Sequence, residues 1–176
     1  MKRLILMRHA KTEPWYQGGD DESRALLPRG KHDAGLVAAE LKARGWVPDL
    51  VLISSARRTR ETWLSMKDYF PGTERQVFED LYLAGTSTLE SMIKEHASTR
   101  ALMLIGHNPG MHDLAAGLSS RAGSVHQKAA MTLASKMPTS AAALFETVTP
   151  GPFQPDAFRL QDYIIAKRLR PEQMSE

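Results

Sequence analysis

Basic side chains that could act on a phosphoryl group follow three short apolar runs of this chain. They are Arg8, His9, His107 and one of the arginines in the segment Arg57-Arg58-Thr59-Arg60. Arginine keeps its charge at any working pH, and its planar fork matches the oxygens of a phosphate. Imidazole is a competent nucleophile at neutral pH and can form a covalent phospho-enzyme. The set suits phosphoryl binding and transfer, although an isolated Arg-His pair is more often a solvated charge beside a structural histidine.

The apolar runs have the pattern of strands that are buried on both faces. Helical patterns separate them, and this alternation indicates an α/β fold with a mostly parallel sheet. The carboxyl ends of parallel strands meet at one edge of the sheet, where ligands bind, so we expect the four side chains to converge there. The predicted strands are Leu4–Met7, Leu50–Ile53, Gln76–Phe78 and Ala101–Ile105, and the predicted helices cover residues 28–44, 57–69, from 87 or 88 to 97, and 111–118.

The carboxyl-terminal part of the chain departs from this alternation. Residues 119–137 have only weak helical character. An apolar strand is predicted at 140–148 and a last one within 157–169. Their connection is too short for a crossover helix, which predicts an antiparallel pair. We therefore expect three layers, a mostly parallel central sheet with helices on both faces, in a single domain over residues 1–176.

Two segments beside the strand ends could complete a site. Residues 11–27 are polar and lack helical or strand periodicity, which predicts a long loop that borders the site. Ser54 or Ser55 is expected to cap the helix that begins near Arg57. The backbone amides at the start of that helix would add positive charge to the strand ends.

The composition argues against several other classes of function. The 176 residues include no cysteine, which excludes disulfides, thiolate metal sites and cysteine nucleophiles. The net charge of +3 is too small to indicate nucleic-acid binding. No P-loop, zinc-protease or dinucleotide-binding motif occurs, so we expect neither a metal nor another cofactor. The amino-terminal apolar run is too short for a signal peptide or a membrane span, which predicts a cytoplasmic protein without membrane contacts.

Four segments, in order along the chain, carry a more specific signal. They are Leu6-Met7-Arg8-His9-Ala10, Arg24-Ala25-Leu26-Leu27-Pro28-Arg29-Gly30, Ser54-Ser55-Ala56-Arg57-Arg58-Thr59-Arg60-Glu61-Thr62 and Gly106-His107-Asn108-Pro109-Gly110. They resemble the motifs of the histidine phosphatase superfamily, which has the phosphoglycerate mutase-like fold. The chain departs from these motifs at Ser55, where proline is usual, and at Leu27, where threonine is usual. Its short length resembles the SixA-like phosphohistidine phosphatase branch.

The resemblance implies a role for each candidate residue. His9 would be the phosphorylated nucleophile, and Arg8, Arg58 and His107 would hold the phosphoryl group. In the mutase-like branch the general acid is a glutamate after the third strand, which points to Glu79 here. In the acid-phosphatase branch an aspartate follows the second histidine. Asn108 stands at that position, which argues against that branch.

We therefore expect a metal-independent phosphatase that forms a phosphohistidine intermediate. Its substrate would be a histidine-phosphorylated protein or a small phosphate ester. Two alternatives remain open on the same residues: a phosphoglycerate mutase-type transferase, and a module that binds phosphorylated ligands without turnover. The absence of long insertions favours a monomer.

Overall fold

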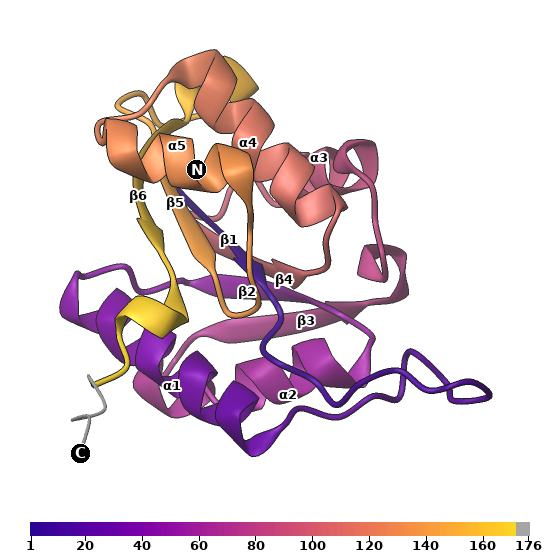
Figure 1. The fold of residues 1–176 in the computed structure, drawn as a ribbon. Helices are drawn as coiled ribbons and strands as arrows, with labels where there is room; N and C mark the ends of the chain where they lie inside the picture. The colour runs from indigo at the N-terminus through magenta and orange to yellow at the C-terminus, as the bar shows by residue number, and fades with distance from the viewer. Residues whose placement is uncertain (172–176) are drawn as a thin grey trace.

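A six-stranded sheet forms the centre of the computed structural model, which describes residues 1–171 (Figure 1). The strands are β1 (Arg3–Arg8), β2 (Leu50–Ser54), β3 (Glu74–Phe78), β4 (Ala101–Gly106), β5 (Ala142–Glu146) and β6 (Arg159–Ile164). They lie in the order β3-β2-β4-β1-β5-β6. The first four strands run parallel, and β5 pairs antiparallel with β1 and β6. The predicted sheet and its antiparallel end are confirmed.

Helices cover both faces of the sheet, as predicted. The α-helices are α1 (Pro28–Ala43), α2 (Arg57–Leu64), α3 (Thr86–Glu95), α4 (Gly110–Ala122) and α5 (Gln127–Ser135). In Figure 1, α1 and α2 lie on one face, and α3, α4 and α5 lie on the other. The three-layer α/β fold is thus confirmed. That one domain spans residues 1–176 stays a prediction, and its last five residues lie outside the described part.

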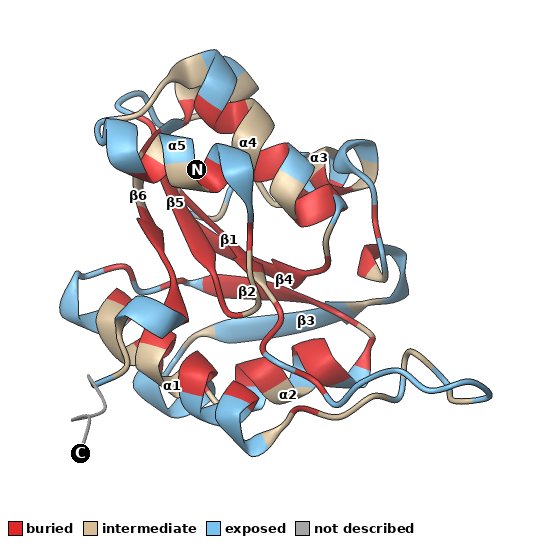
Figure 2. Ribbon diagram, in the orientation of Figure 1, coloured by how far each residue is buried: buried red, intermediate tan, exposed pale blue. Residues whose placement is uncertain are grey.

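Strand β1 shows why both faces need helices. Ile5 and Met7 belong to the core under α1 and α2, whereas Leu4 and Leu6 belong to the core under α3, α4 and α5. All four side chains are at most 1% exposed. Burying such a side chain contributes roughly 1.5–3 kcal/mol, so an uninterrupted apolar run is stable only between two helical layers. Figure 2 shows the central strands buried and the edge strand β3 exposed.

The helix boundaries differ from the sequence prediction in ways that matter for the site. Helix α2 ends at Leu64 instead of continuing to residue 69, where a separate 3-10 turn lies at Lys67–Tyr69. Its amino-terminal cap is Ala56, and no side chain caps it. The expected caps are engaged elsewhere: the hydroxyl of Ser54 contacts His107, and the hydroxyl of Ser55 donates to Glu22.

The polar segment after β1 is a long loop, as predicted, and it is held at several points. An isolated bridge joins Thr12 to Leu26 near its two ends. Farther out, the Arg57 amide at the start of α2 donates to the Glu22 carbonyl at 2.9 Å. Gly30 allows α1 to approach the start of the loop, since a Cβ there would lie 2.2 Å from the Lys11 carbonyl oxygen. The loop therefore closes over the ends of β1 and β2.

No helix within residues 1–171 combines the length and the apolar character that crossing a membrane requires.

Candidate active site

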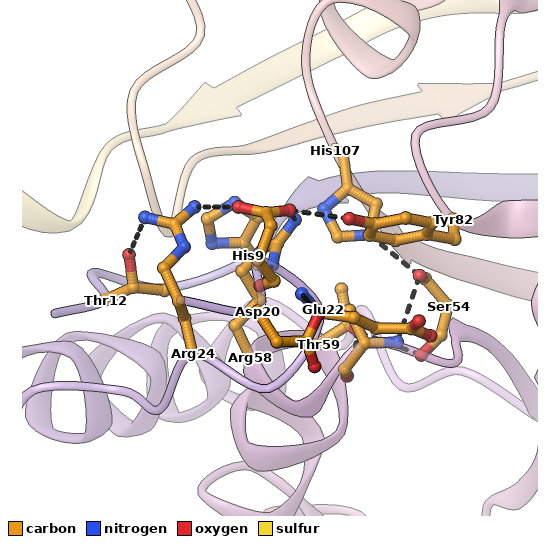
Figure 3. A network of polar contacts seen from close by, with 12 residues as sticks. His9, Thr12, Asp20, Glu22, Arg24, Ser54, Arg58, Thr59, Tyr82 and His107 are labelled. Atoms are coloured by element: carbon orange, nitrogen blue, oxygen red, sulfur yellow. Dashed lines mark hydrogen bonds and ion pairs between the residues drawn. The ribbon is translucent and has the colours of Figure 1, made fainter. Parts of the chain in front are cut away.

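The sheet register places the two site histidines side by side. In the parallel β1–β4 pair, Arg8 lies opposite Gly106, so His9 and His107 are the first residues after the two strands. The His9 amide donates to the Gly106 carbonyl at 3.0 Å, and the centroids of the two imidazole rings lie 5.4 Å apart. Figure 3 shows both rings beside Arg58, which comes from the first turn of α2. The predicted convergence of these residues is present in the structure.

The position of the His9 ring determines which nitrogen can react. Its Nδ1 lies 2.8 Å from the Ala10 carbonyl oxygen. A carbonyl only accepts hydrogen bonds, so Nδ1 carries the proton and Nε2 keeps its lone pair. Burial lowers the pKa of His9 to about 3, and three nearby guanidinium charges act in the same direction. His9 is therefore neutral at physiological pH, as a nitrogen nucleophile must be.

Helix α2 holds the chain just after the nucleophile. The Ala10 amide donates to the Thr62 hydroxyl at 3.0 Å, and that hydroxyl donates to the Arg58 carbonyl at 2.6 Å. Thr62 and Arg58 are both buried. One threonine thus connects the turn at His9 to the residue that carries the site's buried guanidinium.

Arg58 is held by a residue that the sequence analysis did not select. Its Nη1 donates to the Asp21 carbonyl at 2.7 Å, and its Nη2 lies 3.0 Å from the Asp21 carboxylate. The same carboxylate accepts the Tyr82 hydroxyl at 2.6 Å and pairs with Arg24 at 3.0 Å. Burial opposes ionisation of Asp21, but these donors outweigh it and hold its pKa below the usual range. Asp21 therefore orients Arg58 as an anion.

His107 is fixed from two sides. Its Nε2 lies 2.7 Å from the Ser54 hydroxyl, and the Tyr82 ring meets its ring edge-on at 5.5 Å (Figure 3). Burial lowers the pKa of His107 to about 3, with further lowering by the Arg58 charge. The neighbouring Asn108 donates to the Met137 carbonyl at 2.9 Å. His107 is thus a neutral, oriented hydrogen-bonding group.

Several buried nitrogen atoms near the rings, three of them arginine donors, have no hydrogen-bond partner within the described residues. Within residues 1–171, no hydrogen-bond partner contacts Nε of Arg8, Arg24 or Arg58, or Nδ1 of His107. A buried donor without a partner costs about 1–3 kcal/mol. Three of these side chains are arginines, so the donors and the net positive charge favour an oxyanion between them.

Within residues 1–171, the side chain of Glu79 makes no hydrogen bond or ion pair with this cluster. It lies exposed in the 3-10 turn Glu79–Leu81 that follows β3. Its carboxylate makes no hydrogen bond or ion pair within the described residues. Tyr82, three residues later, contacts Asp21 and His107 instead. The role of Glu79 as a proton donor stays a prediction.

Sequence reasoning missed Asp21, Tyr82 and the role of Arg24. Asp21 lies in the polar loop, which has no periodicity to locate it, although Arg24 belongs to a segment already noted as family-like. Within residues 1–171, no group of three or more His, Cys, Asp or Glu side chains could hold a metal ion.

Comparisons with known proteins agree with this geometry. A family model described as the histidine phosphatase superfamily (branch 1) matches residues 4–82, which include His9 and Arg58. A structure described as a putative phosphohistidine phosphatase SixA from Agrobacterium tumefaciens covers 93% of this chain and 97% of that chain, at 29% identity and a TM-score of 0.78. This chain belongs to the histidine phosphatase superfamily.

Other similar proteins are more distant in sequence or are described only as uncharacterised. A protein histidine phosphatase SixA complexed with tungstate shares the fold, with a TM-score of 0.74 at 18% identity over 96% of this chain and 99% of that one. An uncharacterised protein of Mycobacterium tuberculosis is 34% identical over 78% of this chain and 85% of its own. An uncharacterised chloroplastic protein of Arabidopsis thaliana is 33% identical over 67% of this chain, but the match spans only 59% of that protein.

Proposed function

We propose that this histidine phosphatase hydrolyses a phosphorylated protein histidine or a small phosphate ester through a phosphohistidine intermediate on His9. The observation that supports this most directly is the tautomer of His9, which leaves Nε2 unprotonated beside the guanidinium groups. Neutral imidazole is a nucleophile, and positive charge around the equatorial oxygens is what phosphoryl transfer needs most.

The proposed reaction has two steps, in which the site residues have different roles. In the first, Nε2 of His9 forms a bond to phosphorus while the bond from phosphorus to the leaving group breaks. Arg8, Arg58 and His107 hold the phosphoryl oxygens as charge shifts. In the second, water attacks phosphorus, the N–P bond breaks, its electron pair returns to Nε2, and inorganic phosphate leaves.

The leaving group needs a proton, and this requirement restricts the substrate. Asp21 is the carboxylate bound to Arg58, but its lowered pKa keeps it ionised. Glu79 is exposed and, within residues 1–171, its carboxylate makes no hydrogen bond or ion pair that would hold it in the site. We therefore expect the best substrates to have leaving groups that need little protonation, such as an imidazole or an aryl oxide.

Hydrolysis of an aryl phosphate tests the proposal. We expect His9→Ala to lower kcat/KM by several orders of magnitude, because it removes the nucleophile. His32→Ala, which removes an exposed histidine on α1, should leave the rate unchanged. A radiolabelled phosphoryl group trapped by acid-free quenching should map to His9; a label on His107 would reverse the two roles. Equal phosphate release by wild type and His9→Ala would favour the binding-module alternative.

The mutase alternative has its own test. A phosphorylated sugar acid would be isomerised without net phosphate release if that alternative holds. Metal independence has a separate test: the phosphatase should release phosphate at the same rate with and without a chelator. Monomeric state and cytoplasmic location remain predictions.

A further inference from the structure

A second cationic site lies next to the catalytic residues. It is a cavity of about 380 Å³ between the first turn of α1, the segment before β5 and the segment after β6. We call this space the basic cavity. Its charged lining residues are Arg29, Asp33, Lys136, Lys167, Arg168 and Arg170. The candidate function assigns no role to any of them.

The charges of the basic cavity do not cancel. Asp33 is 2% exposed and accepts two hydrogen bonds from Arg170, at 2.9 and 2.6 Å. This pair is neutral as a unit. The other cations, Arg29, Lys136, Lys167 and Arg168, are exposed, and none forms an ion pair within residues 1–171. Within residues 1–171, four positive charges therefore surround this cavity, and no carboxylate forms an ion pair with any of them.

The basic cavity shares a wall with the catalytic site. The Met137 carbonyl accepts the Arg8 guanidinium at 2.9 Å, and the residues on either side of Met137 line the cavity. Tyr163 connects the same two places, because its hydroxyl donates to the Lys136 carbonyl at 2.9 Å. The charges of Arg168 and Arg8 both lower the pKa of Tyr163, although burial raises it overall.

On another side of the cavity, the first turn of α1 also contacts the segment that follows the nucleophile. Gly30 follows Arg29 and packs against the backbone of Lys11, two residues after His9. A ligand in the basic cavity would therefore lie near the segments that carry Arg8 and His9 rather than on a remote face.

We propose that the basic cavity binds a second oxyanion, a carboxylate or a phosphate, carried by the leaving group of a small phosphorylated substrate. This inference rests on the proposed function and narrows its two substrate classes to the small molecule. The volume is that of a small-molecule site. The separate cations suit an oxyanion because hydrogen bonds between charged partners are the strong ones.

Matched aryl phosphates test the inference. The probes are para-carboxyphenyl phosphate, its longer carboxyethyl homologue and para-phenylene bisphosphate, and the neutral reference is para-carbamoylphenyl phosphate. We expect wild type to prefer at least one charged probe over the reference by about tenfold or more in kcat/KM. The carboxylate and bisphosphate arms distinguish the two kinds of oxyanion.

Charge-removing variants test whether the basic cavity causes this preference. Lys167→Gln/Arg168→Gln should abolish it while leaving hydrolysis of the neutral reference unchanged. Lys94→Gln/Arg100→Gln removes the same two charge types from exposed positions elsewhere and should retain it. A preference that is equal in all three proteins, or absent from wild type, overturns the inference. So does hydrolysis confined to a histidine-phosphorylated protein.

Calorimetric binding separates this inference from the proposed function. Titration of the same probes into His9→Ala, with and without the Lys167→Gln/Arg168→Gln pair, needs no turnover. A binding preference that the pair removes supports the basic cavity even if wild type hydrolyses none of the probes, in which case only the proposed function fails. Equal binding of charged and neutral probes refutes the inference while the hydrolysis assay still decides the function.

Discussion

Lowering the pH from 7 to 5 should destabilise this protein mainly through its two site histidines. Burial lowers the pKa of both His9 and His107 to about 3, whereas an unfolded histidine titrates near 6.5. Their contribution to stability is therefore fully present above pH 6.5. It is lost as the pH falls from 6.5 towards 3, because the unfolded chain binds protons that the folded chain excludes.

The size of the effect follows from the same values. One pKa unit corresponds to about 1.4 kcal/mol, so at pH 5 each histidine lowers the unfolding free energy by about 2 kcal/mol. Both side chains are less than 10% exposed, at 7% and 3%, so solvent screening removes little of this. Carboxylates with lowered pKa values, such as Asp21 and Glu61, lose their contribution at lower pH. The interval between pH 7 and 5 therefore isolates the histidines.

Urea unfolding at pH 7 and pH 5 measures this directly. We expect a loss of about 4 kcal/mol in wild type and a much smaller loss in His9→Asn/His107→Asn, whatever that variant's stability at pH 7. The same loss in both proteins would refute the assignment of buried, neutral rings. Should the variant not fold, the NMR chemical shifts of the imidazole nitrogens in wild type, followed against pH, provide a second measurement. Protonation of either ring above pH 5 would contradict the argument.

Further substitutions test how the site is held. Asp21→Asn should lower kcat/KM by roughly tenfold, because it weakens charge-assisted bonds worth about 1.5–3 kcal/mol each in a partly exposed setting; unchanged kinetics would exclude a positioning role. Ser54→Ala leaves the buried His107 ring without its 2.7 Å partner, so melting should occur several degrees lower and kcat should fall, with an unaltered melting curve counting against the contact. Gly30→Ala places a Cβ 2.2 Å from a backbone oxygen and should lower the unfolding free energy by about 1–3 kcal/mol or more, while Gly151→Ala, which meets nothing within 4 Å, serves as the control in the same denaturation assay.

The strand ends could be predicted from the sequence because their chemistry is local. An apolar run such as Leu4–Met7 is stable only between two helical layers, and its length indicates a strand. The alternation of strands and helices then makes the sheet parallel, which brings Arg8, His9 and His107 to one edge. The choice of Arg58 over Arg57 and Arg60, which share the first turn after the strand, came only from the resemblance to the family motif.

Tertiary structure alone decided how these residues are oriented. Asp21 lies in a polar loop without periodicity, and only the folding of that loop over α2 brings its carboxylate to Arg58 and Tyr82. Ser54 was expected to cap a helix, but the proximity of β2 and β4 directs its hydroxyl to His107 instead. Sequence spacing determines which side chains reach an edge of the sheet. The hydrogen bonds between distant segments determine which atoms face the substrate, because those contacts have no fixed separation along the chain.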